Sequence, residues 1–249
     1  MAKKDSNIKI PVNGGTAEHT VVSHDQWMRA RKKLLAKEKK LSRERDAINR
    51  LRRELPWEKM DKPYIFQGPD GTESLGDLFG QHNQLLVYHF MFAPEWKEGC
   101  AHCSFWADHY DAMGVFLAAR DTAFAVISRA PMSKIRPFKQ RMGWKFKWVS
   151  SGENDFNYDL MVSFPPEQVK TGHIFYNYAD QKSEVTSDRE GASAFYKHKA
   201  VVYHTYSTYA RGIDLLNSTY NWLDLTAKGR DEGDMGQFWV KFHDKYGEP

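Results

Sequence analysis

The feature that most constrains this chain is a buried-strand pattern followed closely by its two cysteines. Residues 84–92 read Gln-Leu-Leu-Val-Tyr-His-Phe-Met-Phe, an apolar run that is typical of a strand inside a sheet. Cys100 and Cys103 follow after a short loop, in the spacing C-x-x-C. Beyond them, apolar residues recur at helical spacing to about Arg120. The sequence therefore predicts a strand, a loop and a helix that begins at the cysteines.

This placement favours thiolate chemistry. The unpaired N–H groups and the partial positive charge of a helix start stabilise an anion, and only the thiolate form of cysteine attacks a disulfide. We expect Cys100, the outer residue, to be the nucleophile, and Cys103, one turn further, to resolve the mixed disulfide. A protonated His102 beside the sulfur lowers the pKa of the Cys100 thiol further.

Two other interpretations of the cysteine pair stay open. A structural zinc site needs four ligands, and the sequence has no second C-x-x-C, so nearby histidines would have to complete the site. The second interpretation is a pair of buried, inert cysteines. The histidines closest in sequence are His82, His89, His102 and His109.

The cysteine count and the N-terminal sequence bear on the compartment and on the role of the cysteine pair. The chain has two cysteines in 249 residues, and a single pair in a reducing compartment is more often catalytic or redox-sensing than structural. No apolar run reaches transmembrane length, and residues 1–7 lack the apolar core of a signal peptide, so we expect a cytoplasmic protein with no membrane contact. A net charge of +4 gives no general argument for nucleic-acid binding, which we do not expect.

The positive charge is concentrated in one predicted helix, from about Asp25 to Leu55. Ser23 and Gln26 form a capping-box pattern at its start, and Pro56 stops it. Residues 29–54 contain twelve lysines and arginines against four acidic residues. Apolar residues recur every seven positions, which supports only half of a coiled-coil seam. We expect a solvated helix that packs one narrow apolar stripe on its own domain or on a second copy in a homodimer, and recruitment of an acidic partner stays open as an alternative.

Strand and helix patterns alternate through the remainder of the chain, and this order predicts an α/β fold with a central mixed sheet and helices packed on it. We expect an N-terminal arm and basic helix over residues 1–60, with residues 1–22 as a flexible lead-in, and one domain over residues 61–249. Residues 150–191, rich in Asn, Asp, Tyr and Pro, are interpreted as an insertion that covers the cysteine site. The expected elements are a hairpin at 64–75, strands at 84–92, 122–128 and 145–149, a helix at 132–142, a hairpin at 194–206 and a helix at 212–224.

The strand before Cys100-Ala101-His102-Cys103 resembles the active-site segment of thioredoxin-fold proteins, near their peroxiredoxin and thiol-reductase branch. More specifically, the chain resembles a bacterial thioredoxin-like family catalogued as a domain of unknown function. The resemblance implies a three-layer fold. The phrases that carry it are Arg52-Arg53-Glu54-Leu55-Pro56-Trp57, Tyr88-His89-Phe90-Met91-Phe92 and His204-Thr205-Tyr206-Ser207-Thr208-Tyr209-Ala210-Arg211-Gly212.

The chain departs from the thioredoxin pattern in two places. The stretch Gly191-Ala192-Ser193 has no proline where thioredoxin-like oxidoreductases usually place one, and Gly99 stands where a tryptophan is usual. The peroxiredoxin pattern Pro-x-x-x-Thr-x-x-Cys is absent after Pro94. We therefore expect thiol–disulfide exchange on a protein or small-molecule disulfide or thiol, with catalytic Cys100, Cys103 and His102 and no dissociable cofactor. The alternatives are a binding or redox-sensing scaffold and a Cys/His metal site.

Overall fold

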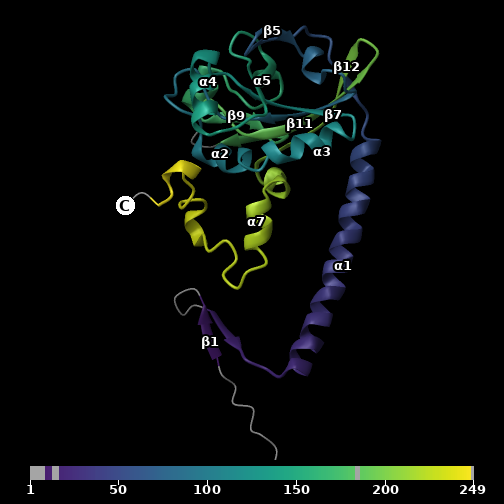
Figure 1. The fold of residues 1–249 in the computed structure, drawn as a ribbon, viewed down its shortest axis with the longest axis vertical. Coiled ribbons are helices and arrows are strands. Elements are labelled where there is room, and N and C mark those ends of the chain that lie inside the picture. The colour runs from purple at the N-terminus through teal and green to yellow at the C-terminus, as the bar shows by residue number, and fades with distance from the viewer. Residues whose placement is uncertain (1–8, 13–16, 183–185, 248–249) are drawn as a thin grey trace, which may run out of the picture. The chain divides into compact units, whose positions relative to one another are not determined.

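The computed structural model describes residues 9–12, 17–182 and 186–247, and the chain forms two units (Figure 1). The first unit comprises residues 1–55 and 219–234, and the second comprises residues 56–218 and 235–249. The sheet and both cysteines belong to the second unit.

Helix α1 (His24–Glu54) dominates the first unit. The Ser23 backbone N–H donates to Gln26 Oε1 at 2.9 Å, and the Gln26 N–H donates to Ser23 Oγ at 3.4 Å, which confirms the predicted capping box. No residue of α1 is buried. The capping residues and the charged surface therefore specify this helix, because none of its side chains is buried.

The first unit also contains a hairpin that the sequence did not predict. Strands β1 (Lys9–Val12) and β2 (Ala17–Thr20) pair antiparallel, whereas we expected a flexible lead-in over residues 1–22. Residues 1–8 and 13–16 of that lead-in lie outside the described residues. The second segment of the first unit, residues 219–234, contains most of helix α7 (Ser218–Leu223). The turn η5 (Gly233–Met235) lies at the end of this segment.

An eight-stranded mixed sheet organises the second unit, in the order β3-β12-β11-β6-β7-β8-β4-β5. The three central strands β6, β7 and β8 are parallel, and the hairpin β11–β12 adds to β6 in antiparallel fashion. The strands are β3 (Glu58–Lys59), β4 (Ile65–Gly68), β5 (Gly71–Ser74), β6 (Gln84–His89), β7 (Thr122–Ser128), β8 (Lys147–Ser150), β11 (Gly191–His198) and β12 (Val201–Tyr209).

Helices lie on both faces of this sheet, so the second unit has three layers (Figure 1). The parallel strands joined by helices, followed by an antiparallel hairpin, give a thioredoxin-like arrangement, and the predicted α/β fold with a mixed sheet and an N-terminal helix is confirmed. The helices and turns of this unit are η2 (Asp77–Phe79), α2 (Ala101–Ala107), η3 (Asp111–Met113), α3 (Gly114–Ala118), α4 (Met132–Arg141), α5 (Phe156–Asp159), α6 (Pro166–Thr171), η4 (Ala210–Leu216) and η6 (His243–Lys245).

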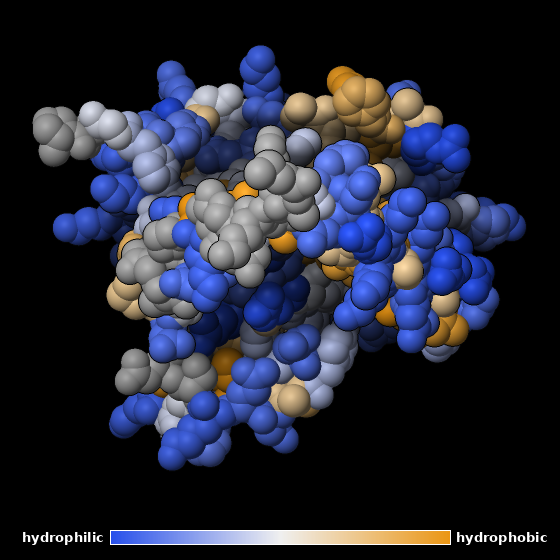
Figure 2. Space-filling view, turned by 90° about the horizontal axis from the view of Figure 1, so that it is seen from below, coloured by the Kyte–Doolittle hydropathy of each residue, from blue (hydrophilic) through white to orange (hydrophobic). Residues whose placement is uncertain are grey.

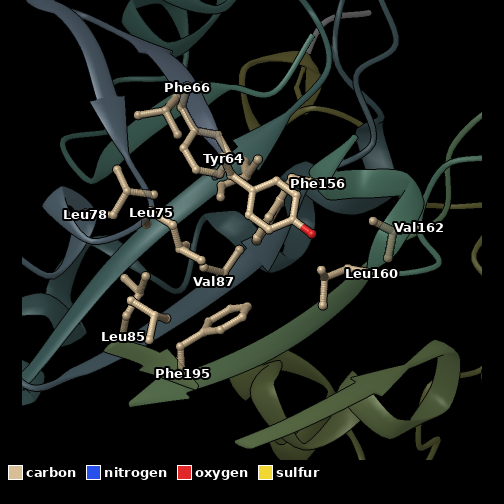
Figure 3. Close-up of a cluster of buried hydrophobic side chains, with 14 of the residues drawn as sticks. Tyr64, Phe66, Leu75, Leu78, Leu85, Val87, Phe156, Leu160, Val162 and Phe195 are labelled. Carbon is tan, nitrogen blue, oxygen red and sulfur yellow. The ribbon is translucent and has the colours of Figure 1, made fainter. Parts of the chain in front are cut away.

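One face of the sheet carries the main apolar core (Figure 3). Leu85 and Val87 of β6 point to this face, where Phe156 of α5 packs edge-on against Tyr64 and Phe66, with both ring centroids 5.1 Å away. Because strand side chains alternate, Leu86 and Tyr88 point to the other face. The alternation of side chains along β6 therefore contributes residues to two cores, one on each face of the sheet.

The second face is built mainly from aromatic rings. Phe90, Trp144 and Trp148 pack around Phe138 of α4, with ring centroids 4.7 to 6.3 Å apart. Most of these pairs are edge-to-face or tilted, as the aromatic quadrupole favours. This cluster anchors the chain on either side of the cysteine loop.

The prediction of one continuous helix from the cysteines to Arg120 is wrong. It divides into α2, η3 and α3. The Asp111 carboxylate accepts hydrogen bonds from the backbone N–H groups of Lys145 and Phe146 at 2.8 to 2.9 Å, and the buried Tyr110 ring turns towards the sheet. These long-range contacts override the helical period that the sequence shows.

The predicted helix over residues 212–224 is likewise divided, into η4 and α7. Asn217, which separates the two, is buried and has an extended backbone. Ala210 begins η4 with a φ of 48°, and its N–H donates to the Tyr176 hydroxyl at 3.0 Å. A tertiary contact again sets the break.

Residues 150–191 form α5, α6 and the hairpin β9 (His173–Tyr176) and β10 (Ala179–Lys182). Most of this insertion packs into the main core through residues such as Leu160 and Ile174. Only its last residues, Arg189 and Glu190, reach the cysteine pocket. The expectation that the insertion covers the site therefore holds for its end alone.

On the molecular face shown in Figure 2, hydrophilic side chains predominate and apolar ones form smaller, separate groups. Across the described residues, each helix is too short or too polar to cross a lipid bilayer.

Candidate functional site

Met91, two residues beyond the end of β6, holds both cysteines through its main chain. The Cys100 N–H donates to the Met91 carbonyl at 3.1 Å, and the Met91 N–H donates to the Cys103 sulfur at 3.5 Å. The Cys100 carbonyl in turn accepts the N–H and the hydroxyl of Ser104 at 3.0 and 2.9 Å, which starts α2. The cysteines are therefore held by the sheet as well as by their own helix.

Gly99 allows this close approach of the chain to the second core. A Cβ atom on Gly99 would lie 2.6 Å from a Phe90 ring carbon and 2.8 Å from a Phe138 ring carbon. Both distances are far below van der Waals contact, so no larger residue fits here without displacement of the aromatic cluster. This explains why glycine stands where thioredoxin-like proteins usually have tryptophan.

The two thiols have opposite environments. Cys100 is partly exposed, whereas Cys103 is 2 % exposed, and neither is in a disulfide. A hydrogen bond from the Cys103 thiol, aided by His102 and the Cys103 backbone N–H, lowers the pKa of the Cys100 thiol well below its usual value despite the opposing effect of burial. Burial, and then the neighbouring Cys100, raise the pKa of Cys103 well above its usual value. These environments favour the thiolate form at Cys100 and the protonated thiol at Cys103.

His102 lies beside the Cys100 sulfur at the start of α2. Its Nε2 lies 3.3 Å from the Gln237 carbonyl oxygen, so Nε2–H donates to that carbonyl. The hydrogen bond with the Cys100 thiolate raises the pKa of His102, against the effect of burial. The imidazole and the thiolate thus stabilise each other's charged form.

A pocket of about 280 Å³ opens beside the two sulfurs. The Trp106 ring forms part of its wall, with Nε1–H donating to the Ile213 carbonyl at 3.0 Å. Arg211 and Asp214 form an ion pair of 3.2 Å at its rim. The pocket therefore presents both charges near the thiolate. Its lining residues are Tyr88, Met91, Cys100, His102, Cys103, Trp106, Arg189, Glu190, Ala210, Arg211, Ile213, Asp214 and Gln237.

The structure brings together Cys100, Cys103 and His102, the three residues that the sequence singled out. Sequence reasoning missed Arg189, Glu190 and Gln237 because they come from segments more than 80 residues further along the chain. No local motif marks these positions. Only the return of β11 beside β6 brings the first two to the pocket.

Of the four histidines considered for a metal site, His102 lies beside the cysteines and the other three make separate contacts. His89 Nε2 lies 2.7 Å from Ser193 Oγ, His82 faces Asp121 at 3.7 Å, and His109 Nδ1 lies 2.9 Å from the Ser218 hydroxyl. In the part of the chain that the structure describes, no three His, Cys, Asp or Glu side chains gather as a metal-ligand set.

A polar chain crosses the sheet from the interior to the surface. His89 Nε2 lies 2.7 Å from Ser193 Oγ, which lies 2.6 Å from Ser207 Oγ. Ser207 continues to His204 Nε2 at 2.7 Å, and His204 Nδ1 reaches the exposed Glu58 carboxylate at 3.1 Å. Burial, and to a lesser extent His204, lower the pKa of His89 to about 3. The buried imidazole is therefore neutral at physiological pH.

Solved structures with a related arrangement include two peroxiredoxin-type proteins. Peroxidoxin BcpB from Mycobacterium tuberculosis is 12% identical over 64% of this chain and 91% of its own length, with a TM-score of 0.41. Peroxiredoxin Q from Xanthomonas campestris is 11% identical over 64% of this chain and 87% of its own, with a TM-score of 0.41. At these scores, neither likeness bears on the reaction.

No functionally curated protein is significantly similar in sequence. A family model described as "Bacterial protein of unknown function (DUF899)" matches residues 16–246, which cover most of both units and include the cysteine pair. The resemblance found in the sequence is thereby confirmed, and the chain belongs to the DUF899 family.

Proposed function

We propose that the protein is a thiol–disulfide oxidoreductase that uses Cys100 and Cys103. The observation that carries this proposal is the unequal pair. Cys100 is partly exposed at a pocket with a lowered pKa, and Cys103 is buried with a raised pKa. Since thiolates attack and thiols do not, this arrangement gives one reactive sulfur and one that reacts second.

The exchange takes place in two steps. The Cys100 thiolate attacks one sulfur of a substrate disulfide, which forms a mixed disulfide and releases the other half of the substrate as a thiolate. Cys103 then loses its proton to solvent or to the released thiolate and attacks the Cys100 sulfur. This step forms the 100–103 disulfide and releases the second half of the substrate. Two electrons pass from the protein dithiol to the substrate, and the reverse sequence oxidises a dithiol.

The neighbouring side chains suit this chemistry. His102 stabilises the attacking thiolate and, as an acid, can protonate the leaving thiolate. The pocket presents both charges, so it suits a protein or small-molecule disulfide rather than one anionic substrate class. No dissociable cofactor takes part. The reducing cytoplasm, where we expect the protein, keeps such a pair in the dithiol form.

The pH dependence of alkylation tests the proposal. The fully reduced protein is treated with iodoacetamide from pH 5 to pH 10, and modification of Cys100 is followed by peptide mass spectrometry. We expect a midpoint well below the free-thiol pKa of about 8.5. The Cys100→Ser variant, with Cys103 alone, should react slowly at neutral pH because its thiol is buried. A Cys100 midpoint at or above about 8.5 would contradict the proposal.

Exchange itself is measured with 2-hydroxyethyl disulfide. The wild type should form the 100–103 disulfide, whereas Cys103→Ser should stop at the mixed disulfide on Cys100. The Cys100→Ser variant should lose exchange by at least about a thousandfold, as expected for removal of a nucleophile. A mixed disulfide that forms on Cys103 instead would reverse the assigned roles.

A second role is favoured by α1, which we propose joins two copies of the protein. Trp27, Leu34, Leu41 and Ile48 recur at seven-residue intervals and are 48 to 70 % exposed. Sedimentation equilibrium should show a dimer that the double variant Leu34→Glu and Leu41→Glu dissociates. A wild type that stays monomeric up to the highest concentration measured would contradict this role.

A further inference from the structure

The hydroxyl group of Tyr88 is buried next to the second cysteine. Tyr88 of β6 and Cys103 of α2 both line the cysteine pocket, and Tyr88 as a whole is 1 % exposed. Its ring packs edge-on against the Tyr110 ring, with the centroids 5.0 Å apart. The hydroxyl oxygen is closed to solvent and forms no hydrogen bond to a nitrogen or oxygen atom of the described residues. A fixed O–H donor therefore lies inside the protein, beside a sulfur that the proposed reaction uses.

The Cys103 sulfur is the group that acts most directly on this hydroxyl. Burial, and then the charge of an ionised Cys103 together with a hydrogen bond to its sulfur, raise the pKa of Tyr88 well above its usual value. Tyr88 is therefore a neutral phenol at physiological pH. A thiol is a weak hydrogen-bond acceptor, whereas an anionic acceptor forms a shorter and stronger bond. The hydroxyl thus gains a full partner only when Cys103 loses its proton.

The other surroundings of Cys103 largely oppose a negative charge. Burial, the neighbouring Cys100 and the Glu190 carboxylate all raise the pKa of Cys103. The Met91 N–H, which donates to the sulfur at 3.5 Å, acts in the opposite direction. The second step of the exchange nevertheless requires the Cys103 thiolate, because a thiol does not attack a disulfide. A further donor at this sulfur therefore has a direct effect on the reaction.

We propose that Tyr88 is a catalytic residue of the second exchange step, in which its hydroxyl donates to the Cys103 thiolate. This inference rests on the proposed thiol–disulfide exchange. The Cys103 proton passes to solvent or to the released thiolate, and the Cys103 thiolate attacks the Cys100 sulfur. The bond between the two cysteines forms while the bond from Cys100 to the substrate sulfur breaks, and the substrate half leaves as a thiolate. The proton of Tyr88 stays on its oxygen throughout.

This contact favours the charged stage of the step over the states on either side of it. In the mixed disulfide Cys103 is a neutral thiol, and in the product it is part of a neutral disulfide, so it is a poor acceptor in both. An interaction that is strongest where charge develops lowers the barrier instead of stabilising a resting state. Because Cys100 makes the first attack, removal of the hydroxyl should slow the second step and spare the first.

Single-turnover kinetics with 4,4′-dithiodipyridine tests the inference, because release of each half of this disulfide changes its absorbance. With the reduced full-length protein in slight excess, the first phase reports attack by Cys100. The second phase, which is independent of concentration, reports attack by Cys103. In Tyr88→Phe, which removes only the hydroxyl, the second phase should slow at least about tenfold at pH 7, the effect of one unit in the pKa of Cys103. The first phase should stay within about threefold of the wild type, well inside that one-unit effect.

Tyr110→Phe is the matched control. Tyr110 is 3 % exposed, and its hydroxyl likewise forms no hydrogen bond to a nitrogen or oxygen atom of the described residues. Its second phase should stay within about threefold of the wild type, less than half a pKa unit. Equal slowing in the two variants would indicate a packing effect of the ring pair and would overturn the inference. If Tyr88→Phe does not fold, replacement of Tyr88 by 3-fluorotyrosine serves, since its stronger O–H donor should speed the second phase and an unchanged rate would overturn the inference.

The two phases separate this inference from the function on which it rests. A wild type with both phases, and a Tyr88→Phe variant with the same second phase, would remove the role of Tyr88 and leave the exchange reaction standing. A wild type without the first phase would overturn the exchange reaction and the role of Tyr88 with it.

Discussion

Helix α1 and strand β6 are equally regular but are specified in different ways. None of the 31 residues of α1 is buried, whereas four of the six residues of β6 are. The helix is defined by its cap, its charges and the proline that follows it. The strand is defined by neighbours on both faces and both edges. The contrast shows that local signals are enough to predict an element, but only long-range packing builds a site.

The largest expected difference between the two regions is in stability. Phe156 is fully buried against Tyr64 and Phe66 at the core face of β6, so Phe156→Ala should lower the free energy of unfolding by about 3–5 kcal/mol. Lys39 of α1 is exposed and lies outside the row formed by Trp27, Leu34, Leu41 and Ile48, so Lys39→Ala should change the free energy of unfolding by less than about 0.5 kcal/mol. Urea unfolding measures both. Similar losses for the two variants would show that α1 is packed after all.

The free energy of unfolding should depend on pH through His89, the buried last residue of β6. The folded pKa of His89 is about 3, below the unfolded value of about 6.5, so the unfolded chain binds the extra proton between these values. Stability should therefore fall as the pH decreases from 6 to 4, by about 1.4 kcal/mol per pH unit from this group.

Urea unfolding at several pH values, for the wild type and His89→Gln, isolates this contribution. The glutamine keeps a polar group near Ser193, and the slope over this range should flatten. An unchanged slope would mean that His89 does not stay neutral in the folded protein. Variation of an α1 histidine, His24→Gln, provides the control.

A smaller effect is expected at the start of α2. Removal of the imidazole in His102→Gln takes away a hydrogen bond and a positive charge from the Cys100 thiolate, which should raise the pKa of Cys100. Alkylation at pH 6 should slow about tenfold, which corresponds to one pKa unit, whereas rates at pH 10 should converge. Equal slowing at both pH values would indicate a structural disturbance instead.

The smallest effect is expected at the cap of α1. Ser23→Ala removes the acceptor for the Gln26 N–H and should cost about 1 kcal/mol. Hydrogen exchange in the first turn of α1 should accelerate about fivefold, while exchange in β6 stays the same. A matching change in β6 would show that the two units unfold together.

Much of the fold could be predicted from the sequence because its signals are local. The continuous apolar runs of β6 and β7 and the cap at Ser23 gave these elements nearly their observed bounds. The helix after Cys103 was wrong in its continuity because Asp111 binds backbone groups 34 and 35 residues away. A helical period cannot reveal such a competitor.

The candidate site likewise has a part that local sequence signals reveal and a part that only the structure reveals. The spacing of Cys100, His102 and Cys103 was visible in the sequence, but the remainder of the pocket was not. Glu190 and Gln237 reach the cysteines only because the chain returns across the sheet and along its end.

The anchoring of Cys100 and Cys103 to the main chain of Met91 has a mechanical consequence. Its carbonyl holds the backbone of Cys100 and its N–H holds the Cys103 sulfur. A shift of the main chain at Met91 therefore moves the backbone of Cys100 and the sulfur of Cys103 together. The orientation of the cysteine pair toward a bound molecule can then change while the two residues keep their positions relative to each other. Because the main chain makes both contacts, replacement of the methionine side chain leaves this coupling in place.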